Sequence, residues 1–248
     1  MRFSLCIAAL VLLVPSLAHA HDGGHQEEDP EPKQRRARLG GLGYIQLGTH
    51  IGPVADVASA LTPASALGDR ATSPGLGYTV GGGGRALILR RLVIGGRGFG
   101  VFSARVGGDR GSANVSGGGG GLELGVAAVN RNSWLLIPYV GGGAGGLTVE
   151  VANESEEPIT VADDESIPSQ GSRTYDAGFG YVEFGVATHR LLFFGDGGFA
   201  LGFDVGATIS VAPSPWSTGG QDIDGMGRAR LSGGFFRLTL GGGGFWFD

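Results

Sequence analysis

The segment FALGFDVGATISV, residues 199–211, decides the fold class because its side chains alternate between two kinds. Phe199 begins an apolar series that continues at every second residue to Val211. The intervening residues are small or polar and include Asp204. Alternation with period two places the two series on opposite faces of a β-strand. The segment therefore predicts a strand with one apolar face and one face that carries a charge.

Period-two patterning recurs along most of the chain and defines eight candidate strands. We expect them at 39–50, 76–89, 92–106, 115–129, 134–151, 174–188, 198–211 and 229–247. The links after the first, third, fifth and seventh strands span 51–75, 107–114, 152–173 and 212–228, whereas the other three span 90–91, 130–133 and about 189–197. Three of the first four are longer than every link in the second group. Short turns at one end and long loops at the other are typical of outer-membrane barrels. The sequence thus predicts an all-β fold, an antiparallel up-and-down transmembrane β-barrel of eight strands.

Charged residues on the candidate strands predict what fills the barrel. The face opposite the apolar one collects Arg85, Arg97, Arg105, Glu123, Glu150, Glu183, Asp204 and Arg237. An isolated buried charge is very costly, but pairing offsets much of that cost. We expect these residues to form an interior charge network that plugs the barrel, with the apolar face against lipid. A soluble barrel with its apolar face inward remains the alternative.

Glycine makes up 51 of the 248 residues, and its runs lie inside the candidate strands. Examples are 81–84, 117–121, 141–143 and 241–244. Glycine normally weakens a strand, because it has no side chain to pack. We interpret the inward-facing glycines as space for the long side chains of neighbouring strands.

Aromatic residues gather where the candidate strands meet the short turns. We expect an aromatic girdle at that end of the barrel, formed by Trp134, Phe193, Phe194, Phe245, Trp246 and Phe247. Such girdles mark the membrane interface of outer-membrane barrels. Ordinary packing residues are the alternative interpretation.

The N-terminus carries the features of an export signal. Arg2 precedes an apolar run at 3–14, and Ala18-His19-Ala20 forms a cleavage site. We therefore expect a signal peptide at 1–20 cleaved after Ala20, a disordered periplasmic leader at 21–38 and a barrel domain at 39–248.

Other motifs give little support to catalysis or cofactor binding. The net charge of −5 argues against nucleic acid as a partner. The stretch GGRGFG at 95–100 lacks the spacing and the helix of a dinucleotide site. His50 is the only candidate base at the predicted outer rim, and His189 falls at the opposite rim. We expect no enzyme, no cofactor and no metal site, although the acidic loop 152–173 leaves cation binding open.

In architecture, residues 39–247 resemble the small eight-stranded outer-membrane barrels of Gram-negative bacteria, such as the membrane domains of outer-membrane proteins A, X and W. The resemblance implies an outer-membrane location, contact with lipid and lipopolysaccharide, insertion by the barrel-assembly machinery and a monomeric state. These barrels usually end on an aromatic residue, whereas this chain adds Asp248 after Phe247.

The expected role is structural or surface-interacting, exerted through long extracellular loops. Three alternatives stay open: a narrow channel for small molecules, a barrel enzyme acting on lipid or peptide, and a soluble secreted barrel that binds a ligand.

Overall fold

The computed structural model describes residues 37–52, 76–103, 105–131, 133–162, 165–194, 197–223, 228 and 230–247. The predicted signal peptide and nearly all of the predicted leader lie outside these residues. Within them every regular element is a β-strand. No helix in this part of the chain is long and apolar enough to cross a membrane.

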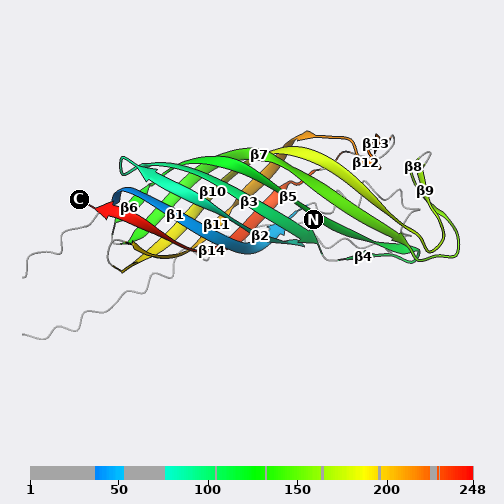
Figure 1. The fold of residues 1–248 in the computed structure, drawn as a ribbon, viewed down its shortest axis with the longest axis horizontal. Coiled ribbons are helices and arrows are strands. Elements are labelled where there is room, and N and C mark those ends of the chain that lie inside the picture. Colours follow the sequence, from blue (N-terminus) through cyan, green and yellow to red (C-terminus); the bar gives the residue numbers. More distant parts are fainter. Residues whose placement is uncertain are drawn as a thin grey trace, which may run out of the picture. The chain divides into compact units, whose positions relative to one another are not determined.

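Eight long strands close into an antiparallel barrel (Figure 1). They are β1 (Ala37–Ile51), β2 (Leu76–Ile88), β3 (Leu92–Ser103), β5 (Gly111–Val126), β7 (Trp134–Asn153), β10 (Ser172–Phe194), β11 (Gly197–Pro213) and β14 (Gly233–Phe247). Each strand pairs with the next one along the chain, and β14 pairs with β1 to complete the circle. The predicted up-and-down barrel fold is confirmed.

The strands are strongly staggered around the barrel. A row of directly paired residues that leaves β1 at His50 passes once around the barrel and returns to β1 at Gly40. Such a stagger requires the strands to tilt against the barrel axis. Figure 1 shows this oblique course, which brings residues from distant strands to the same height inside the barrel.

The two ends of the barrel differ in the length of their connections. At the turn end, β2 and β3 join through residues 89–91, where Leu89 and Arg90 have positive φ as in a type I′ turn. The short strand β6 (Val129–Arg131) lies at the same end. At the loop end lie β4 (Val106–Gly107), β8 (Ile159–Ala162), β9 (Glu165–Ile167), β12 (Ser217–Thr218) and β13 (Gln221–Asp222) (Figure 1).

Apolar side chains fill the barrel at both ends. The cluster nearer the loop end includes Val149, Tyr175 and Trp216. The other cluster includes Leu135 and Leu191, close to the turn end. The predicted charges that lie inside the barrel occupy the space between these two groups of residues. The interior is therefore packed with side chains along its length, as expected of an eight-stranded barrel.

Inward glycines make room for large side chains of other strands. A Cβ atom added to Gly83 would lie 2.9 Å from the Tyr44 hydroxyl oxygen. A Cβ atom added to Gly121 would lie 2.7 Å from the Tyr181 hydroxyl oxygen. A Cβ atom at either position would also collide with a backbone carbonyl oxygen of a neighbouring strand, Gly96 O or Gly142 O, so these positions exclude any side chain. Glycine in these strands therefore permits the packing of the interior.

Candidate functional site

Six of the eight predicted strand charges meet inside the barrel. Their side chains are at most 3% exposed and come from six different strands. We call these residues the charged layer: Arg85, Arg97, Glu123, Glu183, Asp204 and Arg237. Three positive and three negative groups balance, so the layer has no net charge. Neutral pairing is the arrangement in which buried charges are least costly.

Arg85 of β2 organises one half of the charged layer. Its guanidinium Nη2 lies 2.7 Å from Asp204 Oδ2 and 3.2 Å from Glu123 Oε2, and its Nε also donates to Glu123. Its Nη1 lies 2.7 Å from Nε2 of His189. Because a guanidinium only donates, His189 Nε2 accepts this hydrogen bond and the imidazole is neutral.

Glu183 of β10 organises the other half. Its carboxylate receives hydrogen bonds from Arg237 at 3.0 and 3.1 Å, and it also pairs with Arg97. The Tyr139 hydroxyl donates to Glu183 at 2.8 Å and accepts from Arg97 at 3.3 Å. Arg97 Nη1 lies 3.8 Å from Glu123 Oε2, and this contact joins the two halves. The charged layer is therefore one continuous network across the barrel.

Arg105 and Glu150 do not belong to this layer, contrary to expectation. The side chain of Arg105 is 67% exposed at the loop end, where it pairs with Glu154 at 2.5 Å. Strand β3 ends at Ser103, so Arg105 lies beyond the barrel wall. Glu150 is exposed on the outer face of β7. That part of β7 places its apolar residues inward against the loop-end cluster, so its polar residues face outward.

The aromatic residues predicted as a girdle do not all face outward. Trp134 is 45% exposed, and the Arg190 guanidinium carbon lies 5.1 Å from its ring centroid. Phe245 is buried, on the same face of β14 as Arg237, because the register with β1 is unbroken between them. The other four residues belong to β10 and β14, but their side chains lie outside the described part of the structure: Phe193, Phe194, Trp246 and Phe247.

His189 does not lie at the rim of the barrel where the sequence placed it, whereas His50 is the penultimate residue of β1, at the loop end. His189 is 1% exposed within the barrel, because β10 continues to Phe194 instead of ending at residue 188. His189 shares its face of β10 with Glu183, so a longer predicted strand would have placed it among the charges. His50 is 2% exposed and also faces inward. His21 and His25, in the predicted leader, lie outside the described residues.

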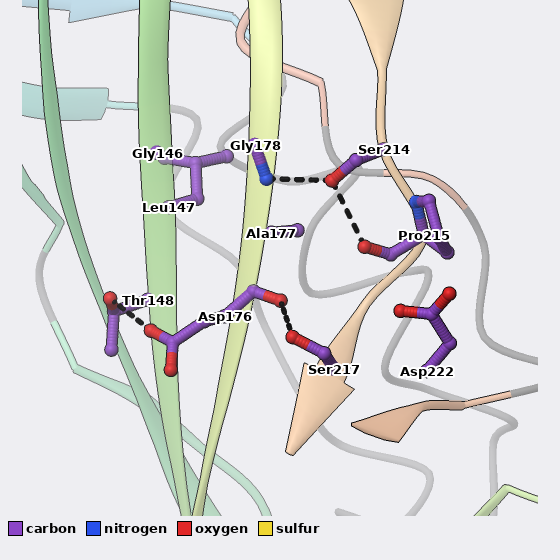
Figure 2. A pocket seen from close by; sticks show the side chains of 10 residues that line it. All are labelled: Gly146, Leu147, Thr148, Asp176, Ala177, Gly178, Ser214, Pro215, Ser217 and Asp222. Atoms are coloured by element: carbon purple, nitrogen blue, oxygen red, sulfur yellow. Dashed lines mark hydrogen bonds between the residues drawn. The ribbon is translucent and has the colours of Figure 1, made fainter. Parts of the chain in front are cut away.

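A groove of about 510 Å³ opens on the outer surface at the loop end (Figure 2). Thr148 of β7 donates to Asp176 of β10 at 2.7 Å in its floor. β12 follows along β10, with Ser217 Oγ donating to the Asp176 carbonyl oxygen at 3.2 Å. Asp222 lines the far side. Sequence reasoning missed this groove, because nothing in the local pattern shows that β12 pairs with β10.

The acidic loop 152–173 folds against the barrel. Its β8–β9 hairpin buries Ile159 and Ile167 in the loop-end apolar cluster. The Asn153 side chain donates to the carbonyl oxygens of Glu157 at 2.8 Å and Pro168 at 2.9 Å, which fixes the base of the loop. Within the described residues, no group of three or more histidine, cysteine or acidic side chains could hold a metal ion.

No family model matches the chain, and no curated protein matches it. Among solved structures, the outer membrane protease OmpT from Escherichia coli matches with a TM-score of 0.33 and 8% identity, covering 87% of this chain and 98% of that chain. The enduracididine biosynthesis enzyme MppR matches with a TM-score of 0.20 and 9% identity, covering 85% of this chain and 86% of that chain. An acetoacetate decarboxylase-like enzyme from Sphingomonas wittichii matches with a TM-score of 0.17 and 11% identity, covering 86% of this chain and 93% of that chain.

These matches bear on two expectations from the sequence. An outer-membrane protein is among the matches, but no family model identifies the chain as one of the protein A, X or W type. The expectation that the chain is not an enzyme was wrong as an exclusion, because the matched outer-membrane protein is itself a protease. The scores are too low for any residue of these proteins to be matched to a residue of this chain.

Proposed function

We propose that this chain is an outer-membrane β-barrel that spans the lipid bilayer and interacts with its surroundings through its loop end. The supporting observation is a reversed burial pattern within single strands. In β14, Arg237 is 2% exposed, whereas the adjacent Phe236 and Leu238 are 39% and 57% exposed. A soluble barrel shows the opposite pattern, with apolar residues inside and charges in water.

The exposed apolar side chains form a belt to which all eight strands contribute. It includes Ile45, Val80, Ile94, Leu122, Val140, Phe184, Phe203 and Leu238, each between 40% and 76% exposed. Soluble monomers rarely expose a continuous apolar patch larger than a few hundred Å². A belt around the whole barrel cannot be covered by one partner on one side. A bilayer covers it from every direction, and the polar groove and hairpin then lie above the belt.

Because the interior is packed with side chains, we expect the protein to act through its loop end. The charged layer is neutral and internally paired, and apolar side chains fill the barrel on both sides of it. These contents favour a closed barrel over a channel for solutes. At the loop end, by contrast, the groove and the side chains of Glu154, Glu156 and Glu157 are open to water. We propose that this surface contacts lipopolysaccharide or other molecules at the cell surface.

Membrane insertion is tested by gel mobility of the detergent-extracted protein, before and after boiling. A closed membrane barrel stays folded in detergent until it is heated, so its band is expected to shift on boiling. The protein is also expected in the outer-membrane fraction. An unshifted band together with recovery in the soluble periplasmic fraction would reject the proposal.

Orientation is tested by short epitope tags placed in two turns. The Gly219–Gly220 turn between β12 and β13 lies at the loop end, and the Leu89–Arg90 turn lies at the other. We expect an antibody to detect the first tag on intact cells and the second only after the outer membrane is permeabilised. Detection of the Leu89–Arg90 tag alone on intact cells would invert the proposed orientation.

A further inference from the structure

A second group of buried polar side chains surrounds Gly48 on β1. Gln46 and His50 lie two residues before and after it, on the same inward face of the strand. Thr79 of β2 and Arg237 of β14 are the direct partners of Gly48 on its two neighbouring strands. We call Gln46, His50, Thr79 and Arg237 the Gly48 patch.

Every member of the Gly48 patch is buried, and each has a polar atom without a hydrogen-bond partner among the described residues. Their exposures are 1% for Gln46, 2% for His50, 4% for Thr79 and 2% for Arg237. The unpartnered atoms are Nε2 and Oε1 of Gln46, Nε2 of His50, Oγ1 of Thr79 and Nε of Arg237. Buried polar atoms in native proteins nearly always bond to protein or to ordered water. Five of the ten unpartnered side-chain atoms among the described residues belong to this patch. They point to a binding partner that is not a protein group.

The chemistry of these atoms selects the ligand. The Arg237 Nε and Gln46 Nε2 groups only donate, Gln46 Oε1 only accepts, and the Thr79 hydroxyl does both. The charge of Arg237 is already balanced by Glu183, which its terminal nitrogens contact at 3.0 and 3.1 Å. An anion would find no free positive charge, and a metal cation would face two groups that only donate. Water both donates and accepts, and it carries no charge.

We propose that the Gly48 patch is a binding site for ordered water molecules inside the barrel. These waters complete the hydrogen bonding of β1, β2 and β14 and connect Gln46, His50 and Thr79 to Arg237 of the charged layer. Glycine is required at the centre, because a Cβ atom at position 48 would lie 2.7 Å from the Arg237 Cα atom. The site concerns the interior alone, so it holds whether or not the barrel spans a membrane.

The test is the substitution Thr79→Val, which keeps the shape of the side chain but removes its hydroxyl. If water is bound, the substitution leaves that water without a partner, and the midpoint of heat-induced unfolding falls by about 2–4 °C. If the patch is dry, the substitution removes an unsatisfied hydroxyl, and an unchanged or higher midpoint would overturn the proposal. Unfolding of the purified protein is followed by the loss of its far-ultraviolet circular dichroism, which reports strand content whether or not the barrel is a membrane protein.

Two matched variants calibrate this measurement. Thr208→Val removes a hydroxyl that donates to Glu183 at 3.3 Å, so its midpoint is expected to fall. Thr188→Val removes another unpartnered hydroxyl, which lies on β10 outside the patch, so no fall is expected. A crystal structure of the unaltered protein that resolves ordered water decides the question even if Thr79→Val fails to fold. Water within hydrogen-bond distance of Thr79 and Gln46 supports the site, and an empty patch rejects it.

Discussion

Asp204 and Arg237 are direct neighbours across the β11–β14 pair, yet each forms its ion pairs with residues of other strands. Asp204 pairs with Arg85 of β2 at 2.7 Å, and Arg237 pairs with Glu183 of β10 at 3.0 Å. These contacts cross the barrel interior and connect strands that share no backbone hydrogen bonds. The charged layer therefore braces the barrel across its width.

Glu183 is the residue of the charged layer whose loss should cost most, because two arginines depend on it. Glu183→Gln keeps the size of the side chain but leaves three arginines against two carboxylates in the charged layer, with Arg237 losing the carboxylate that it contacts. Breaking a buried pair in this way costs about 3–5 kcal/mol. We expect a clearly lower midpoint of heat-induced unfolding in the gel-shift assay. Glu150→Gln is the control, because Glu150 is exposed, and a similar loss there would contradict this account.

Inward and outward glycines should respond differently to the same substitution. Gly83→Val forces a side chain against the Tyr44 hydroxyl and the Gly96 carbonyl oxygen. Overpacking of this kind costs about 1–3 kcal/mol. Gly41→Val is the control, because no atom lies within 4 Å of a Cβ at that position. Equal loss of stability in the two variants, measured by heat-induced unfolding, would show that side-chain space does not explain the inward glycines.

Leu47 tests whether the apolar belt contacts lipid. It is 59% exposed on β1, so a soluble barrel would accept Leu47→Arg with little change in stability. In a bilayer the same substitution is expected to cost about 2–4 kcal/mol at the midplane. The measurement is the free energy of unfolding in lipid vesicles. Leu89→Arg in the turn after β2 should have little effect, and equal stability of the two variants would argue against a lipid-facing belt.

The β8–β9 hairpin should detach without unfolding the barrel. Ile167→Ala removes most of a fully buried side chain from the loop-end cluster, which weakens the docking of the hairpin. We expect faster proteolytic cleavage within residues 152–173, while the gel shift on boiling is retained. Ser166→Ala, at an exposed neighbouring position, serves as the control. Unchanged cleavage of Ile167→Ala would mean that the hairpin is held by other contacts.

The strand pattern and most of the charged layer could be predicted because charges stand out against apolar neighbours. β7 could not be oriented in this way. Leu135 and Ile137 face inward, but Leu136 and Val140 on the opposite face are also apolar. Alternation therefore carries no signal there, and Glu150 was assigned to the wrong face.

Other features depend on contacts that are remote in sequence. The groove requires Ser217 to meet Asp176, and the Gly48 patch requires Thr79 and Arg237 to meet at the same glycine. Pairing between distant strands sets both, so no local pattern shows them. His189 was missed for a simpler reason, namely that the predicted strand was too short.

The seam between β1 and β14 has a consequence for how the chain reaches its folded state. These strands stand at opposite ends of the barrel sequence, and β14 also supplies Arg237. Until the last strand is in place, both edges of the sheet are open to other chains and Glu183 lacks one of its partners. A chain truncated before residue 233 should therefore aggregate instead of forming a smaller barrel. Closure of the barrel therefore requires that the C-terminal strand β14 has been synthesised.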